Sequence, residues 1–160
     1  MKKISEVVYL DTNTYCRPLD EQKDRRIHAE TEALLKIFNA VEKGEIKIIS
    51  SDYVKFEIEH IQDPLKRKDV RGFERILSKT NVTSSRQLIS LAREYASKCN
   101  LGSLDALHLA AACIGKADFL LTCDDKIIES AICVETLAAQ RGHRLKVRNP
   151  INYLKERRIK

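Results

Sequence analysis

Four acidic residues stand where the local pattern does not favour a solvated charge, and two of them follow predicted strands. Asp11 comes directly after the apolar run VVYL, which is typical of a fully buried strand. Asp124 comes two residues after a second such run, FLLT, and has Asp125 beside it. Parallel sheets bind ligands beyond the carboxyl ends of their strands. We therefore expect Asp11 and Asp124 to lie at the same edge of one sheet.

The other two acids belong to predicted helices. Glu57 lies on or beside the apolar stripe of the segment SSDYVKFEIEHIQ, where an unpaired charge is costly. Asp105 opens the segment SLDALHLAAACIG, which is apolar nearly all round and is expected to be buried. A simpler structural explanation exists for three of the four acids. Glu57 suits a salt bridge at the edge of the core, Asp105 suits the positive end of a helix dipole, and Asp124 suits a helix N-cap.

Carboxylates gathered at one place would need a cation. Three or four of them repel one another strongly, and a hard dication removes that repulsion. Oxygen ligands select Mg²⁺ or Mn²⁺ over zinc. The histidines also argue against zinc, because they show neither HxH nor HExxH spacing; they are His28, His60, His108 and His143. A magnesium ion on carboxylates holds a phosphate oxygen and activates a bound water, so hydrolysis of a phosphodiester bond is the expected chemistry.

Short buried strands alternate with helices along the chain, which predicts an α/β fold with a mostly parallel sheet of about four or five strands. The expected strands are VVYL, IKII, DFLLT and LKV, with NVT as a short strand or an extended connection. Helices are expected on both faces of this sheet. The 160 residues contain no repeat and no low-complexity linker, so one domain spanning residues 1–160 is expected.

Composition places the chain among ordinary globular proteins, with 43% hydrophobic and 32% charged residues. No apolar run approaches the roughly 20 residues of a membrane span, and the run near the N-terminus is too short for a signal peptide. We therefore expect a cytoplasmic protein. The cysteines form no CxxC pair and are expected to be small reduced core residues rather than metal ligands or disulfides. They are Cys16, Cys99, Cys113, Cys123 and Cys133.

The positive charge is unevenly distributed. Residues 141–160 hold eight basic residues and one acid, Glu156. The formal charge of this segment, 8 − 1 = +7, exceeds the net charge of +6 of the whole chain. A second basic cluster lies at 66–68. Such patches suit a polyanion, although a solvated tail and a solvated helix face explain them equally simply. The candidate nucleic-acid contacts are Lys66, Arg67, Lys68, Arg157 and Arg158, with Arg17 as a weaker one.

Five segments, taken in order, resemble the PIN domain, a metal-dependent nuclease family that includes VapC-type toxins. They are YLDTN, SSDYVKFEIE, LDALHLAAA, FLLTCDDKI and VRNPINYLKE, and YCRPLD resembles one PIN subgroup. The resemblance implies an α/β/α sandwich with strand order 3-2-1-4-5. It also implies that the catalytic and metal-binding acids are Asp11, Glu57, Asp105 and Asp124.

The same resemblance assigns supporting roles. Asn13 and Thr122 would orient the carboxylates and waters, although turn and cap roles suit both residues as well. Asp125 is not the matched position and is expected to be exposed or to hold an auxiliary water. The segment 128–146 is longer than the usual PIN link, so an added or extended helix is expected there.

The function that the resemblance implies is a Mg²⁺- or Mn²⁺-dependent endoribonuclease with RNA as its partner. It could be the toxin of a toxin–antitoxin pair, with a small antitoxin and a homodimer as further partners. One alternative is a non-catalytic PIN-like module that binds RNA or protein, which retention of all four acids disfavours. Another is a phosphatase-like hydrolase with a second aspartate two residues after the strand-end acid. The residue at that position here is Asn13, which weakens this alternative.

Overall fold

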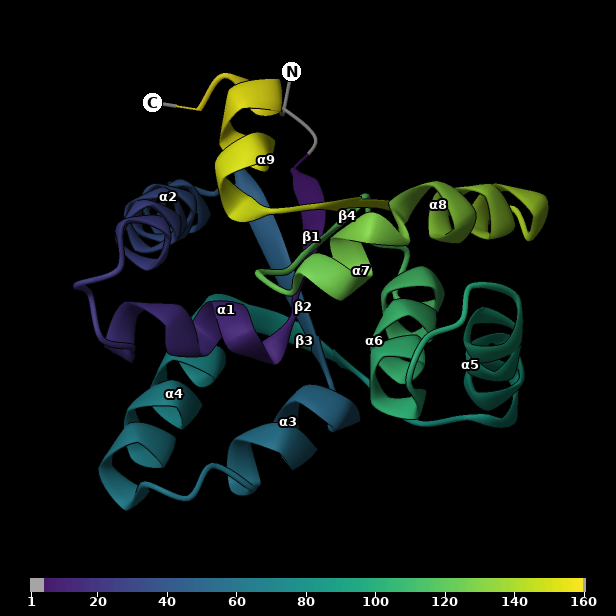
Figure 1. The fold of residues 1–160 in the computed structure, drawn as a ribbon, viewed down its shortest axis with the longest axis horizontal. Helices are drawn as coiled ribbons and strands as arrows, with labels where there is room; N and C mark the ends of the chain where they lie inside the picture. The colour runs from purple at the N-terminus through teal and green to yellow at the C-terminus, as the bar shows by residue number, and fades with distance from the viewer. Residues whose placement is uncertain (1–4, 160) are drawn as a thin grey trace.

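The computed structural model describes residues 5–159, and the strands in that range form one parallel sheet (Figure 1). The sheet has five strands in the order β3-β2-β1-β4-β5. This is the strand order and the α/β class expected from the sequence. The strands are β1 Glu6–Leu10, β2 Ile46–Ser51, β3 Ser78–Val82, β4 Phe119–Leu121 and β5 Lys146–Arg148. Met1–Ile4 of the basic N-terminus and Lys160 of the basic C-terminal segment lie outside the described residues.

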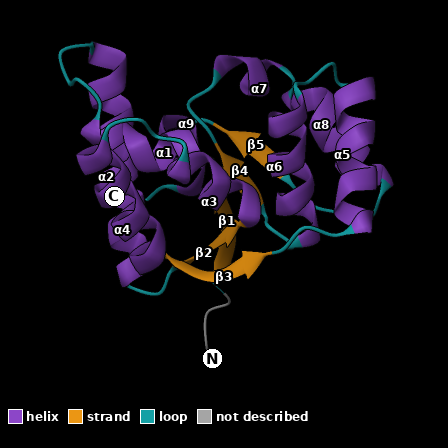
Figure 2. Cartoon of the chain, turned by 90° about the horizontal axis from the view of Figure 1, so that it is seen from below, coloured by secondary structure: helices purple, strands orange, loops and turns teal. Residues whose placement is uncertain are grey.

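Helices connect consecutive strands and cover both faces of the sheet. Figure 2 shows α2, α4 and α9 on one side of the sheet and α5, α6 and α8 on the other. Within residues 5–159, none of the helices is long and apolar enough to cross a membrane. The helices are α1 Thr12–Cys16, α2 Arg25–Glu42, α3 Asp52–Glu59, α4 Pro64–Leu77, α5 Arg86–Lys98, α6 Ser103–Ile114, α7 Asp125–Glu129, α8 Ala131–Gln140 and α9 Pro150–Arg157, with a 3₁₀ turn at Arg17–Leu19.

Polar caps start the helices that leave the carboxyl edge of the sheet. Asp11 caps α1, Ser51 caps α3, Asp124 caps α7 and Asn149 caps α9, each through a side-chain oxygen that accepts a backbone N–H. Caps of these residue types satisfy donors that the first helical turn leaves unpaired. Two of the four caps are therefore also predicted site residues, so cap and site roles coexist at this edge.

A rigid core supports that edge. The sheet's central strands β1 and β4 end in fully buried Leu10 and Leu121, and the middle of α6 is buried all round. Gly115 ends α6 against the sheet, where a Cβ would lie 2.5 Å from Ile49 Cδ1. A side chain at this position would force the Ile49 and Val82 side chains to move, so glycine allows the helix end to lie close to the strands. The strand tips that carry Asp11 and Thr122 are consequently held by close packing on both faces of the sheet.

The prediction that all five cysteines are reduced is wrong for two of them. Cys99 and Cys133 form a disulfide, with their Cα atoms 5.7 Å apart. The residues are 34 positions apart in sequence, and α8 packs beside α5 to bring them together. Helix α8 is the added helix expected in the long 128–146 segment. Cys16, Cys113 and Cys123 are free, and all three are buried or half-buried, as expected.

Candidate active site

Asp11 lies at the centre of the carboxyl edge with its carboxylate fixed by three donors. Its own N–H donates to the Leu121 carbonyl at 3.0 Å, which extends the β1–β4 pairing to this residue. Oδ1 accepts the Thr12 N–H at 2.8 Å. Oδ2 accepts the Thr122 hydroxyl at 2.7 Å and the Asn13 amide at 3.0 Å. The side chain is almost fully buried, so the sheet presents a carboxylate with a set orientation.

Asn13 and Thr122 also connect Asp11 to the loop that bears Asp124. The Asn13 side-chain oxygen accepts the Cys123 N–H at 3.0 Å, and Thr122 Oγ1 accepts the Asp124 N–H at 3.0 Å. Asp124 in turn accepts the Lys126 N–H at 2.9 Å and starts α7. The two residues expected to orient carboxylates therefore lie between the two strand-end acids, in hydrogen-bond contact with both segments.

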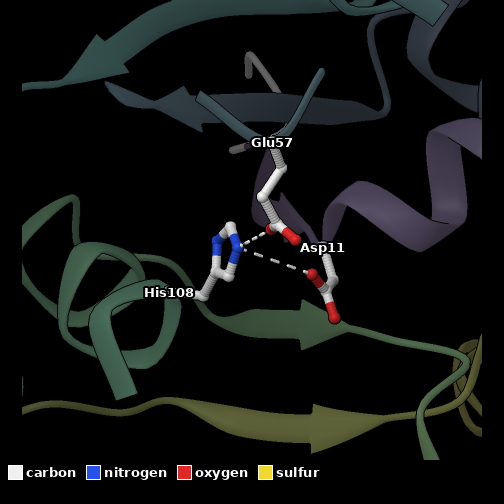
Figure 3. A group of neighbouring side chains, drawn as sticks. All are labelled: Asp11, Glu57 and His108. Carbon is white, nitrogen blue, oxygen red and sulfur yellow. Dashed lines mark hydrogen bonds and ion pairs between the residues drawn. The ribbon is translucent and has the colours of Figure 1, made fainter. Parts of the chain in front are cut away.

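Glu57 reaches Asp11 from α3 and meets a histidine from α6. Glu57 Oε1 accepts the Thr12 hydroxyl at 2.9 Å and is hydrogen bonded to His108 Nε2 (Figure 3). His108 Nε2 also lies 3.8 Å from Asp11 Oδ1. One potential ligand atom from each of Asp11, Glu57 and His108 lies within 4.8 Å of the others. Among the residues described, these three side chains form the tight centre of the site.

His108 is absent from the residues that the sequence predicts for the site. No histidine pair marks it, and its helix is so apolar that a buried core role is the natural interpretation. One signal was available: His108 lies three residues after Asp105, so the two share a face of α6. The side chain is 1% exposed, and its polar contacts are with Asp11 and Glu57 of the site and with Tyr9 of the strand behind it.

Asp105 and Asp124 are not members of this tight centre, but Asp105 is electrostatically coupled to it. Burial raises the pKa of Asp105, and the neighbouring Asp11 and Asp124 carboxylates raise it further. Both side chains are half-buried. The structure thus brings the four predicted acids to one edge of the sheet, with Asp11 and Glu57 in the closest arrangement.

The charges at the centre are only partly compensated. Burial raises the pKa of Asp11, while His108 and Thr122 oppose that increase and Glu57 adds to it. Burial also acts to raise the pKa of Glu57, but the hydrogen bonds that Glu57 accepts from His108 and Thr12 outweigh it and lower this pKa. These hydrogen bonds stabilise the ionised form of Glu57, whereas the repulsion between the Asp11 and Asp105 carboxylates is not relieved.

This pattern fits a hard divalent cation. Carboxylate oxygens from several elements converge, burial and then carboxylate repulsion raise the pKa of Asp11 and of Asp105, and a bound dication would stabilise the ionised form of both. Oxygen-rich donor sets are those that Mg²⁺ and Mn²⁺ prefer. Asp11, Glu57, Asp105 and Asp124 remain the predicted ligands of such an ion.

Comparison with known proteins identifies the family of this site. A family model for the PIN domain matches residues 8–132. The chain belongs to the PIN domain family. No curated protein matches the chain. PIN domains are generally nucleases that use divalent metals and act on nucleic acids, so membership supports a nuclease-type hydrolase. The matched range contains all four acids and His108.

Two of the basic candidates in this PIN domain, Arg17 and Lys66, are engaged in ion pairs. Arg17 lies 3.1 Å from Asp20 and 3.3 Å from Glu30, and Lys66 lies 2.9 Å from Asp20. Burial raises the pKa of the Cys16 thiol to about 11, with Lys66 opposing and Asp11 and Glu57 contributing to the increase. Lys66, Asp11 and Glu57 therefore all lie within electrostatic range of the Cys16 thiol.

The remaining basic candidates lie elsewhere or are engaged. Arg67 donates to the Ile61 carbonyl at 2.8 Å, and Lys68 is exposed on α4. Arg157 pairs with Glu6, the first residue of β1, and Figure 1 shows the end of α9 beside the start of that strand. Arg158 follows it and is exposed. The basic C-terminal residues thus lie at the amino edge of the sheet, opposite the acids.

Asp125 takes no part in the acidic centre of the PIN domain. It is exposed and accepts two hydrogen bonds from the Arg26 guanidinium, at 2.7 Å and 2.5 Å. The pair joins the start of α7 to the start of α2. The sequence predicted that Asp125 is exposed or holds an auxiliary water. The structure shows it exposed, in a salt bridge with Arg26.

Proposed function

We propose that this chain is a Mg²⁺- or Mn²⁺-dependent endoribonuclease that hydrolyses RNA phosphodiester bonds at the carboxyl edge of its sheet. The observation that carries the proposal is the buried Asp11 carboxylate, fixed by three donors and placed beside Glu57. The cap contact to the Thr12 N–H uses only Oδ1, and a buried carboxylate that is incompletely neutralised costs folding free energy. It has a clear use as a cation ligand.

The residues divide the work in the following way. Asp11, Glu57, Asp105 and Asp124 would hold the dication, which when bound supplies an electrophile for the phosphodiester and an activated water. Thr122, Asn13 and the Thr12 N–H keep Asp11 in one orientation, and the Thr12 hydroxyl does the same for Glu57. Preorganised ligands of this type avoid reorganisation at the moment of reaction.

Cleavage within an RNA chain is the finer part of the proposal, and two features support it. The ordered motifs resemble those of VapC-type ribonucleases. In addition, Lys66 lies within electrostatic range of the same Cys16 thiol as Asp11 and Glu57, so it adds positive charge on the side that an RNA strand would approach. Exposed Lys68 follows on the same helix. Basic residues at a nuclease site hold the phosphates that flank the scissile bond.

The decisive experiment compares RNA cleavage by matched aspartate variants. The purified chain is incubated with a mixed RNA pool in Mg²⁺, in Mn²⁺ and in EDTA, alongside Asp11→Asn and Asp118→Asn. Asp118 lies at the opposite end of the sheet, where it accepts the Val7 N–H, so it controls for loss of one carboxylate. We expect cleavage that needs metal, survives in Asp118→Asn and falls about 100-fold in Asp11→Asn. Equal cleavage by the wild-type and Asp11→Asn proteins would refute the nuclease.

The same samples test the alternative of a binding module. A non-catalytic PIN-like protein would retain RNA with strong salt dependence and leave it intact in every metal. The toxin role needs a separate test in cells. Induced expression of the wild-type chain is expected to arrest growth, and expression of Asp11→Asn to the same level is expected to leave growth unchanged.

A further inference from the structure

We infer that His108 is a positioning residue that donates its Nε2–H to Glu57, set in that state by a buried hydrogen-bond relay from Ser51 through Tyr9, and that it is not a metal ligand. This inference rests on the proposed function, because it concerns how Glu57 is prepared to hold a dication. It is drawn from the donors and acceptors that surround three buried side chains.

The relay begins at Ser51, where β2 ends and α3 starts. Its hydroxyl oxygen accepts the backbone N–H groups of Tyr53 and Val54, each at 3.2 Å. A hydroxyl oxygen has two lone pairs, so both are used by these N-cap contacts. The Ser51 proton is then free to be donated, and the partner in reach is Tyr9 Oη at 2.6 Å.

Tyr9 continues the same direction of hydrogen-bond donation, from Ser51 towards the His108 imidazole. Its side chain is fully buried, and its hydroxyl contacts Ser51 and His108 Nδ1, the latter at 2.6 Å. Because Tyr9 Oη receives the Ser51 proton, its own proton points to Nδ1. Nδ1 therefore acts as the acceptor, and in a neutral imidazole the ring hydrogen must then be on Nε2.

The contacts of Nε2, on the other side of the His108 ring, support the same tautomer independently. Nε2 faces Glu57 Oε1 in a hydrogen bond and Asp11 Oδ1 at 3.8 Å. Ionised carboxylates only accept, so a bare Nε2 would direct its lone pair at two oxygen lone pairs. Both ends of the relay thus require a hydrogen on Nε2, and a nitrogen that carries a hydrogen cannot ligate a metal.

The consequence concerns one oxygen of Glu57. Oε1 receives His108 and the Thr12 hydroxyl, so it is occupied by protein donors. Oε2 has no hydrogen bond among the described residues and is the oxygen left for a cation. The relay therefore selects which Glu57 oxygen faces the metal, in the way that outer-shell partners orient carboxylate ligands.

The test is the tautomer of His108, read by long-range ¹H–¹⁵N correlation NMR on the uniformly labelled full-length chain. Spectra are recorded without metal and with saturating Mg²⁺, a diamagnetic ion, at a pH where the imidazole is neutral. We expect Nε2 to be protonated and Nδ1 unprotonated in both spectra. Protonation on Nδ1, or loss of the Nε2 hydrogen when Mg²⁺ binds, would overturn the inference and make His108 a ligand.

Variants add a second readout that does not depend on cleavage. His108→Gln retains an N–H donor near the Nε2 position, whereas His108→Leu has similar volume and no donor. Calorimetric titration with Mg²⁺ is expected to show affinity within a few-fold of wild type for His108→Gln and about 10–100-fold weaker for His108→Leu. Equal affinities for the wild-type and His108→Leu proteins would contradict the positioning role. The metal-free spectrum tests the relay without RNA or metal, so an inactive protein with the expected tautomer would refute only the nuclease.

Discussion

At the residue scale, Asp11 shows that the site works against folding. Burial raises the pKa of its carboxyl group. A carboxyl group whose folded pKa is raised gives stability that is fully present below its unfolded pKa and is lost as the pH rises through the folded pKa. Without metal, ionisation of the Asp11 carboxyl group therefore costs folding free energy, and asparagine does not carry this cost.

We expect metal-free Asp11→Asn to be more stable than wild type at neutral pH, by about 1 kcal/mol. The difference should shrink as the pH falls below the carboxyl range, because both side chains are then uncharged. Saturating Mg²⁺ should reverse the order, since only wild type gains full binding free energy. Urea unfolding at several pH values, with Asp118→Asn as the control, measures this. A less stable Asp11→Asn protein at neutral pH without metal would contradict the expectation.

Thr122 is a second residue whose side chain serves the site. Its hydroxyl donates to Asp11 at 2.7 Å and accepts the Asp124 N–H at 3.0 Å. Thr122 Oγ1 also accepts the Asn13 amide at 3.1 Å. Thr122→Val keeps the shape and removes all three bonds, so we expect a loss of about 1–3 kcal/mol in stability and 10–100-fold weaker Mg²⁺ binding. Thr122→Ser keeps the hydroxyl and should restore binding. Calorimetric titration and urea unfolding of the two variants provide the comparison, and similar Mg²⁺ affinities would remove Thr122 from the site.

At the element scale, the sequence predicts those helices, strands and site positions that depend on a local pattern of residues. Apolar runs predicted the strands β1, β2 and β4. The position of Asp11 and Asp124 at strand ends could be inferred from these runs. Helix α1 reads as a turn in the sequence, because five residues are too few for a periodic pattern. His108 and the Cys99–Cys133 bridge depend on which helices meet in space, and no local pattern encodes that.

Buried Glu30 is another residue that local pattern does not reveal. It is fully buried on α2, accepts the Asn149 amide at 2.6 Å and lies 3.3 Å from Arg17 and 3.5 Å from Arg26. Arg26 in turn holds Asp125. In the sequence Glu30 is one charge on a helix rich in charges. Its role in joining α2, the α7 start and the α9 cap comes only from the fold.

The disulfide gives a prediction about the α5–α6 connection. Cys99 caps the end of α5, immediately before the short loop that leads to Asp105. We expect Cys99→Ser/Cys133→Ser to lower the free energy of unfolding by about 2–4 kcal/mol, because the cross-link constrains the unfolded chain. Amide hydrogen exchange should increase most in residues 99–105. Reductant should destabilise wild type and leave the double variant unchanged; a wild type insensitive to reductant would show that the bridge does not form.

At the scale of the whole molecule, charge separates the two edges of the sheet. The acids occupy the carboxyl edge with Lys66 beside them, while Arg157 and Arg158 lie at the amino edge with Glu6. For the proposed ribonuclease, a net charge of +6 would attract RNA to the molecule as a whole. Only basic residues near the acids, however, would contact the RNA at the cleavage site.

We therefore expect different salt dependences from basic residues at the two edges. RNA binding by Asp11→Asn protein in EDTA, measured across a series of salt concentrations, should lose about one unit of log–log slope when Lys66→Ala is added, because one phosphate contact is removed. Arg158→Asn is the matched control at the amino edge. Asparagine suits the left-handed backbone conformation of that position, where φ is 53°, so the fold should be undisturbed. Its slope should equal that of the parent. If Arg158→Asn lowers the slope as much as Lys66→Ala, the RNA path extends over the amino edge and the basic C-terminal segment belongs to it.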